Sequence, residues 1–166
     1  FSLEDGLRLV IGRAKLMQSM KHGGMDALSV SEADAHKLIE KSGRKLWLAT
    51  NNGLQNTVVS GSFEELGAFE RFLNQEGMDY RRLQTSHAFH SGMMDAILEP
   101  FAKLVETIPM YYPKIPYISN LTGTWITDEV LSPKYWCDHL RNTVRFYDGV
   151  KQILERKCIF IEVGPG

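Results

Sequence analysis

The chain has 166 residues, of which 43% are hydrophobic and 23% charged, and its formal net charge at pH 7 is −1. These values are ordinary for a globular domain, and the small net charge argues against nucleic acid or an anionic membrane surface as a partner. The apolar runs are far shorter than the roughly 18 residues of a membrane span, and the 2 cysteines form neither a disulfide framework nor a CxxC metal motif, so we expect a cytoplasmic protein.

The N-terminal segment predicts a helix from Ser2 to about Met20. Ser2, with Asp5 three residues later, is close to a capping box. Apolar side chains then recur along one helical face: Leu7, Leu9, Val10, Ala14, Leu16 and Met17.

The next segment predicts a strand at about 24–30 and a helix that Ser31 caps. This helix runs through Lys41 and ends at Gly43. The stretches KLWLATNNG and NTVVSG then predict two strands. The turn residues expected between them are Asn51, Asn52 and Gly53.

A second helix of this region is capped by Ser62 with Glu65 and stopped by Gly77, and DYRRLQTS predicts the last strand. The order β-α-β-β-α-β is that of a ferredoxin-like unit. We therefore expect a small subdomain at 24–86, inserted into a core formed by 1–23 and 87–166.

The remainder predicts helices and short strands in alternation. A helix is expected at 93–108, a strand and turn in KIPYISNLTG, and a helix whose N-cap is Ser132 and whose first residue is Pro133. The stretch VRFYDGVKQILERK predicts the last helix and CIFIEV the last strand. Alternation of this kind indicates an α/β core with a largely parallel sheet.

The stretch TSHAFHSGMM places two histidines, His87 and His90, where the predicted subdomain ends. A metal site would need third and fourth ligands, and none stands at a recognised spacing. A catalytic base would need a nucleophile, and no GxSxG elbow occurs in the chain. By spacing alone, two loop histidines bonded to backbone remain the leading interpretation, with the other two left open.

A resemblance changes this weighting. SHAFHSGMM resembles the acyltransferase domains of modular polyketide synthases, relatives of malonyl-CoA:acyl carrier protein transacylase. Six further stretches agree in order and spacing across essentially the whole chain: GRAKLMQ, the GGM at 23–25, VVSG, PYISNLTG, YWCDHLRNTVRF and FIEVGPG. The resemblance implies an α/β-hydrolase-like acyltransferase core, here partial, with the ferredoxin-like insert.

The resemblance also assigns roles. His90 occupies the position of the catalytic histidine, which takes and returns the proton of a serine nucleophile. Arg13 matches the arginine that holds the free carboxylate of the extender unit. His139 falls where the family uses a main-chain carbonyl to orient the imidazole. Asn52 and Met25 match positions near the substrate.

The substrate is implied by the four residues from His87 to His90. In this family HAFH goes with malonyl and YASH with methylmalonyl. Phe89 would fill the space that an α-methyl group needs, and one methyl in a fitted pocket is worth only about 1–3 kcal/mol. His87 and Phe89 are therefore expected beside a malonyl group.

The sequence also departs from the family. The GHSxG elbow would lie upstream of Phe1, so we expect this chain alone not to form an acyl-enzyme. Leu54 and Gly92 stand where prolines are common, and Gly92 should loosen the start of the helix at 93–108.

The implied partners are malonyl-CoA, an acyl carrier protein with its phosphopantetheine arm, and flanking domains of a synthase. No permanently bound cofactor or metal is implied. The alternative is a non-catalytic binding module that keeps the scaffold and the carboxylate clamp.

Overall fold

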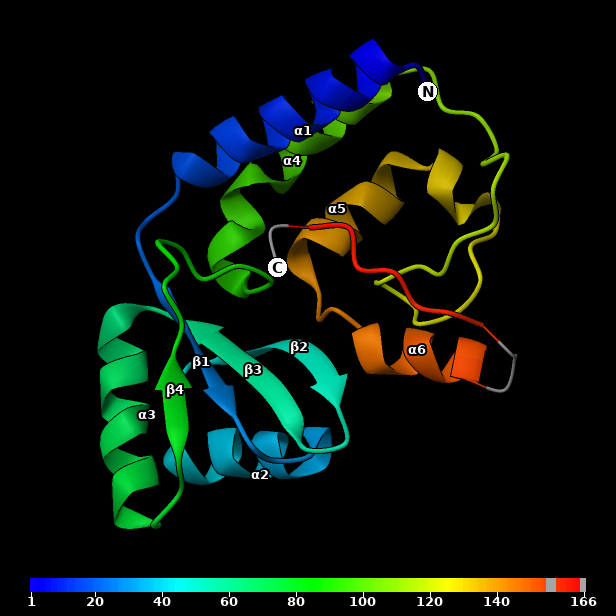
Figure 1. Ribbon diagram of the computed structural model, residues 1–166. Helices are drawn as coiled ribbons and strands as arrows, with labels where there is room; N and C mark the ends of the chain where they lie inside the picture. The colour runs from blue at the N-terminus through cyan, green and yellow to red at the C-terminus, as the bar shows by residue number, and fades with distance from the viewer. Residues whose placement is uncertain (155–157, 165–166) are drawn as a thin grey trace.

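The computed structural model describes residues 1–154 and 158–164. Its first part comprises α1 (Leu3–Gln18), β1 (Gly24–Leu28), α2 (Glu32–Ser42), β2 (Trp47–Gly53), β3 (Asn56–Gly61), α3 (Phe63–Gln75) and β4 (Tyr80–Arg82). Its second part comprises the 3₁₀ helix η1 (Gly92–Ile97), α4 (Leu98–Glu106), the 3₁₀ helix η2 (Asp128–Leu131), α5 (Pro133–Arg141) and α6 (Phe146–Leu154). Figure 1 shows α1, α4 and α5 together, and the sheet with α2 and α3 as a separate layer pair.

The sheet has four strands in the order β2-β3-β1-β4, and every neighbouring pair is antiparallel. This is the strand order of a ferredoxin-like unit, so the predicted β-α-β-β-α-β arrangement is confirmed. The subdomain limits at 24 and 86 stay a prediction.

The two faces of this sheet differ because successive side chains point to opposite sides. One face packs against α2 and α3, where Leu28, Leu48 and Val59 join Leu66 and Phe69 in a buried core. The other face carries a second, smaller buried cluster, formed by Met25, Ala49 and Val58 with Ala27, Leu83 and Phe89 packed against it. The second face therefore turns toward the histidine segment.

Helix caps form where the sequence predicts them. The hydroxyls of Ser2, Ser31 and Ser62 each accept a hydrogen bond from the backbone N–H three residues on. Gly43 follows α2 with φ of 62°, a left-handed conformation that glycine adopts at little cost. Pro133 is the first residue of α5, as predicted.

A separate core joins α1 to the helices of the second part. Leu9 from α1 is buried with Met94, Ile97, Phe101, Val105, Ile108 and Leu140. The approach of α1 to α4 is close because Gly12 has no side chain. A Cβ there would lie 2.2 Å from Leu104 Cδ2.

Five local predictions are wrong. The strand expected in KIPYISNLTG does not form, and Ile118 makes only an isolated antiparallel bridge with Trp125. Asn51, Asn52 and Gly53 lie within β2, and the chain turns at Leu54 and Gln55, because β2 is bulged and continues past the expected turn. The segment expected as one helix at 93–108 begins as a 3₁₀ helix at 92–97.

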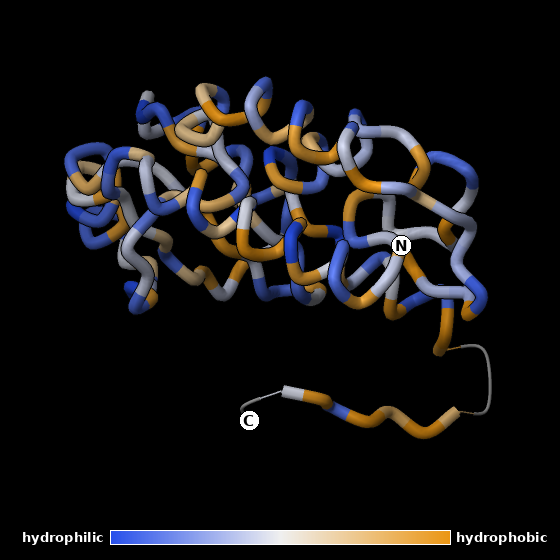
Figure 2. Tube along the Cα trace, turned by 90° about the horizontal axis from the view of Figure 1, so that it is seen from above, coloured by the Kyte–Doolittle hydropathy of each residue, from blue (hydrophilic) through white to orange (hydrophobic). Residues whose placement is uncertain are grey.

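In the described residues, no strand forms at 158–163 and no parallel sheet is present. Thr50 and Val144 make an isolated parallel bridge. A strand exists only when a neighbour supplies its hydrogen bonds, and no described strand pairs with 158–163. Figure 2 shows 158–164 as a mainly hydrophobic segment apart from the body of the molecule.

Candidate active site

His90 lies in the connection between β4 and η1, with a backbone φ of 53°. Among the described residues it is the only non-glycine with a positive φ. This left-handed conformation is uncommon, although histidine tolerates it better than most residues, and it clusters at functional sites. Ser91 closes the turn that contains His90, because its buried hydroxyl donates to the carbonyl of Ala88 at 2.6 Å.

The His90 imidazole is oriented by a main-chain carbonyl, and that carbonyl belongs to Asn142. His90 Nδ1 lies 2.9 Å from Asn142 O. The assignment of this carbonyl to His139 is therefore wrong. His139 lies inside α5, whereas the backbone leaves helical geometry at Asn142, with φ −94° and ψ 169°, and turns its carbonyl toward the imidazole.

This contact fixes the chemistry of the ring. A carbonyl oxygen can only accept, so Nδ1 carries the hydrogen and neutral His90 keeps its lone pair on Nε2. The pKa of His90 is lowered from 6.5 to about 4, chiefly by burial, with the charges of Arg13 and His139 acting in the same direction and the Asn142 hydrogen bond opposing them. His90 is therefore an unprotonated base at neutral pH.

Arg13 projects from α1 near His90 and His139, and its positive charge lowers the pKa of each. Its own pKa is lowered by burial. Its Nε is buried and has no hydrogen-bond partner in the described part of the chain. A buried polar group without a partner is costly, so this guanidinium is suited to an anionic ligand.

A hollow of about 460 Å³ opens beside His90, between the ferredoxin-like unit and the segment after α5. Its lining includes Trp47 of β2 together with Asn142 and Thr143. The His90 imidazole thus lies at the junction of the two parts of the molecule.

The other predicted site residues are placed as follows. Phe89 packs on the open sheet face with Met25, which is buried. His87 is buried, with Nδ1 2.8 Å from Ser86 Oγ and Nε2 3.2 Å from Met20 O. Both His87 nitrogens are thus engaged, and its effect on a ligand would pass through Phe89, whose ring centroid lies 6.0 Å away. Asn52 lies on β2 and is not among the residues that line the hollow.

This arrangement of a carbonyl-oriented histidine and a partnerless arginine can be compared with known proteins. The family model for the acyl transferase domain matches residues 1–165. The chain belongs to the acyltransferase domain family.

Among its relatives, this acyltransferase chain is 36% identical over 167 residues to polyketide synthase GfsA of Streptomyces halstedii. It is 38% identical over 168 residues to the spectinabilin polyketide synthase system protein NorB of Streptomyces orinoci. Both alignments cover 99% of this chain but only 2% and 8% of the relatives. The chain thus spans a small part of the length of these synthases.

Solved structures of acyltransferases are also similar to this chain. The acyl transferase domain of ZmaA is 40% identical, with a TM-score of 0.91, over all of this chain and 38% of its own. Malonyl CoA-acyl carrier protein transacylase from Burkholderia pseudomallei is 28% identical, with a TM-score of 0.84, over 93% of this chain and 54% of its own.

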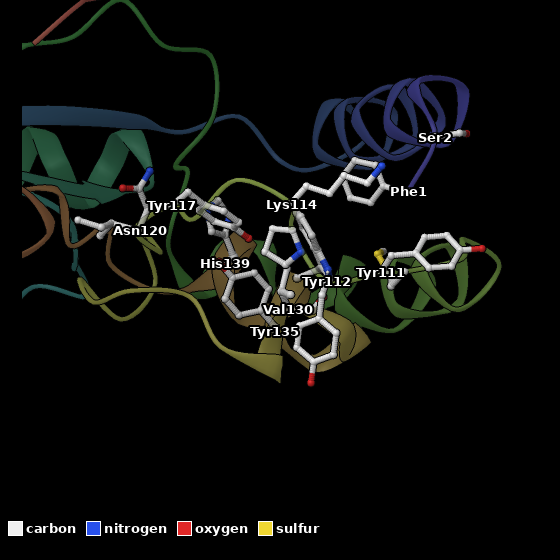
Figure 3. A pocket seen from close by; sticks show the side chains of 14 residues that line it. Phe1, Ser2, Tyr111, Tyr112, Lys114, Tyr117, Asn120, Val130, Tyr135 and His139 are labelled. Atoms are coloured by element: carbon white, nitrogen blue, oxygen red, sulfur yellow. Dashed lines mark hydrogen bonds between the residues drawn. The ribbon is translucent and has the colours of Figure 1, made fainter.

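The acyltransferase chain has a second, larger hollow of about 890 Å³ beside α5 (Figure 3). Its lining is rich in aromatic side chains, including Tyr111, Tyr112, Tyr117 and Trp136, and it includes His139. The His139 side chain belongs to this aromatic groove, where its ring centroid lies 6.1 Å from that of Tyr135.

Sequence reasoning missed Asn142 and the residues that hold it in place. Its contact joins residues 52 apart in the chain. The only local signal was the polar stretch RNT directly after a helix, which indicates a helix end and nothing more.

In the described residues, no helix is long and apolar enough to cross a membrane. Over the same part of the chain, no three His, Cys, Asp or Glu side chains are grouped so that they could hold a metal ion.

Proposed function

We propose that this chain provides the catalytic base and the carboxylate-binding arginine of an acyltransferase that selects malonyl-CoA. The enzyme would transfer the malonyl group to the phosphopantetheine thiol of an acyl carrier protein. The observation that carries the proposal is the pairing of His90, with Nδ1 on the Asn142 carbonyl and Nε2 free, with the partnerless guanidinium of Arg13.

The proposed transfer has two half-reactions. His90 Nε2 removes the proton of a serine hydroxyl as its oxygen attacks the thioester carbonyl, and it then protonates the departing CoA sulfur. In the second half, Nε2 takes the proton of the carrier thiol, whose sulfur attacks the acyl-serine, and returns that proton to the serine oxygen. The low pKa of His90 favours the neutral ring that each half-reaction needs at its start.

Arg13 supplies the selectivity for a dicarboxylic acyl group. A guanidinium fork binds a planar carboxylate with two parallel hydrogen bonds, which fixes the orientation of the group as well as its charge. The free carboxylate of malonyl would satisfy the Arg13 Nε that has no partner in the described structure. A monocarboxylic acyl-CoA would leave it unsatisfied.

Phe89 supplies the proposed preference for malonyl over methylmalonyl. Phe89 is the residue before His90, and its ring packs against the buried cluster that includes Met25 and Val58. A ring packed in this way cannot move aside freely for an α-methyl group. The preference should be moderate, because one methyl is worth about 10- to 200-fold.

The nucleophile is expected from the GHSxG elbow of the family, which this sequence does not contain. In the described residues, no serine or cysteine hydrogen-bonds to His90. We therefore propose that this chain alone forms no acyl-enzyme.

Intact-protein mass after incubation with malonyl-CoA or methylmalonyl-CoA tests the proposal, on this chain and on a longer one extended upstream through an elbow. The expected result is a malonyl adduct on the extended chain only, abolished by His90→Ala and much reduced by Arg13→Ala. Arg71→Ala, which removes an exposed arginine far from His90, is the matched control and should leave the adduct unchanged.

Two other results would change the conclusion. An adduct mainly with methylmalonyl would keep the acyltransferase and reject the role of Phe89. No adduct on a folded extended chain that contains a GHSxG serine would reject the enzyme and favour a binding module that keeps the Arg13 clamp.

A further inference from the structure

The contact that orients His90 depends on a short segment, Asn142–Arg145, between α5 and α6. Asn142 ends α5, and its N–H donates to Asp138 O at 2.8 Å. Its carbonyl contacts His90 Nδ1 at 2.9 Å. The position of the imidazole therefore depends on what holds this segment.

The segment is bound along β2 of the ferredoxin-like unit. Val144 N–H donates to Ala49 O at 2.8 Å, and Asn51 N–H donates to Val144 O at 2.9 Å. Thr143 Oγ1 donates to Leu48 O at 2.7 Å. In hydrogen bonding, the segment is thus a short extra strand on the outer edge of the sheet.

An ion pair fastens the end of this added strand to α2. Arg145 Nη1 lies 2.6 Å from Glu32 Oε1 and 2.8 Å from Oε2. Asn51 Nδ2 donates to Glu32 Oε2 at 2.8 Å, and Asp148 lies 3.7 Å from Arg145. The side chains of Arg145 and Glu32 are 36% and 25% exposed, so water screens them less than it screens a surface pair.

The backbone of Arg145 is held as well, because its N–H donates to Asn120 O at 2.7 Å. Arg145 thus joins three parts of the molecule: α2 through its side chain, residue 120 through its backbone, and α6 through its neighbour in sequence. Glu32, the first residue of α2, is its partner in the ferredoxin-like unit.

We propose that the Arg145–Glu32 pair is a positioning device for the catalytic base. It holds 142–145 against β2, so that the Asn142 carbonyl keeps His90 in the Nδ1–H form with Nε2 turned toward the reacting groups. The ferredoxin-like unit thereby takes part in catalysis through this pair. The catalytic consequence rests on the proposed function, whereas the orientation of His90 does not.

The first test measures that orientation directly on this chain. Two-bond proton–nitrogen NMR spectra of ¹⁵N-histidine-labelled protein report which ring nitrogen of His90 carries the hydrogen. The parent protein should show the Nδ1–H form alone. Arg145→Gln and Glu32→Gln should each give a mixture of the two forms. Arg145→Lys, which keeps the charge but replaces the planar guanidinium with an ammonium group, should fall between.

Lys41→Gln is the matched control, because Lys41 and Glu76 form an ion pair between α2 and α3 of the same unit, away from 142–145. It should leave the His90 signals unchanged. The contacts between 142–145 and β2 are called the seam. If Arg145→Gln does not fold, Thr143→Val removes one contact of the seam. It should also give both forms of His90, with a smaller share of the form that carries the hydrogen on Nε2.

The second test uses the chain extended upstream through a GHSxG elbow. Arg145→Gln should lower kcat by about 10- to 100-fold with little change in KM, because a base displaced by about an ångström loses rate while Arg13 still binds the carboxylate. A merely structural role would reduce the amount of active enzyme without moving the hydrogen on His90.

Folded variants that keep the Nδ1–H form alone would overturn the inference, whatever the activity. If instead the parent protein transfers no acyl group while the variants show the mixture, the proposed function fails and the positioning stands.

Discussion

At the scale of single residues, the site depends on an imidazole that is kept unprotonated. His90 is surrounded by protein and by the positive charge of Arg13, and both disfavour a second charge on the ring. Burial, with the charges of Arg13 and His139, lowers its pKa from 6.5 to about 4 despite the Asn142 hydrogen bond. This shift must appear in the stability of the protein as well as in its chemistry.

We predict that His90 makes the protein less stable in acid. Between pH 6.5 and about 4 the unfolded chain binds a proton at His90 and the folded chain does not, so the free energy of unfolding falls as the pH is lowered through this window. The free energy of unfolding falls by about 3 kcal/mol at most. Partial exposure of the ring makes the actual loss smaller.

Urea unfolding at several pH values, compared with His90→Gln, measures this contribution. The comparison is needed because burial raises the pKa of Asp26 from 3.8 to about 6, which gives a slope of opposite sign, and the variant keeps Asp26. Equal pH dependence in the two proteins would show that the His90 pKa is not lowered.

Phe89 carries a second residue-scale prediction. Phe89→Ser should raise kcat/KM for methylmalonyl relative to malonyl by about 10- to 200-fold in the chain extended through the elbow, because the hydroxymethyl group leaves room for the α-methyl. Competition between the two CoA esters measures the change, read as the ratio of the amounts of the two adducts in the intact-protein mass spectrum. Phe72→Ser, which replaces a partly buried phenylalanine of α3 on the other sheet face, is the control for general loosening. A ratio that moves equally in both variants would reject the steric role.

At the scale of elements, the start of η1 depends on Gly92. The sequence predicted only that this glycine would loosen a helix start. The structure gives it a packing role, because a Cβ at Gly92 would lie 2.5 Å from Trp47 Cζ2 and 2.9 Å from Cε2. Trp47 of β2 thus packs directly against the turn that follows His90, beside the seam at 142–145.

Gly92→Ala should therefore destabilise the protein by about 1–3 kcal/mol, because a rigid indole or the turn itself must move. Gly53→Ala is the control, since its Cβ would meet nothing closer than 3.5 Å. Urea unfolding measures both, and adding Trp47→Leu to Gly92→Ala should restore part of the loss. If Gly92→Ala unfolds like Gly53→Ala, the contact with Trp47 does not constrain this turn.

Elements with local signals were predictable and those with distant partners were not. Ser31, Ser62 and Pro133 each specify a helix start through contacts within one turn, and α2, α3 and α5 begin there. The turn expected at Asn51–Gly53 failed because β2 is bulged and continues to Gly53, which pairs with Asn56 of β3. The carbonyl expected at His139 failed because only the fold brings Asn142 to His90.

At the scale of the whole molecule, two cores meet at one seam. One lies between the sheet and α2 and α3, and the other joins α1, α4 and α5. His90 and 142–145 lie between them. The strand order of the sheet could be predicted from the sequence because a β-α-β-β-α-β order leaves few arrangements. How the two parts pack together could not be predicted, because it depends on contacts between 142–145 and β2 that join residues far apart in the chain.

The segment 158–163 is the largest departure from the expected core. Ile159, Ile161 and Val163 are 91%, 81% and 94% exposed, and Phe160 is 59% exposed. A contiguous apolar surface of this kind promotes association. We predict that this chain self-associates at high concentration, and that Ile161→Lys shifts the equilibrium toward monomer by placing a charge within the apolar run.

Sedimentation velocity over a range of concentrations measures the association. Gln75→Lys, which adds the same charge at an exposed position at the end of α3, is the control and should leave the association unchanged. Far-UV circular dichroism should be identical for all three proteins, because Ile161 makes no part of either core. Equal association of Ile161→Lys and the parent chain would place the contact elsewhere, with the aromatic groove beside α5 as the next surface to substitute.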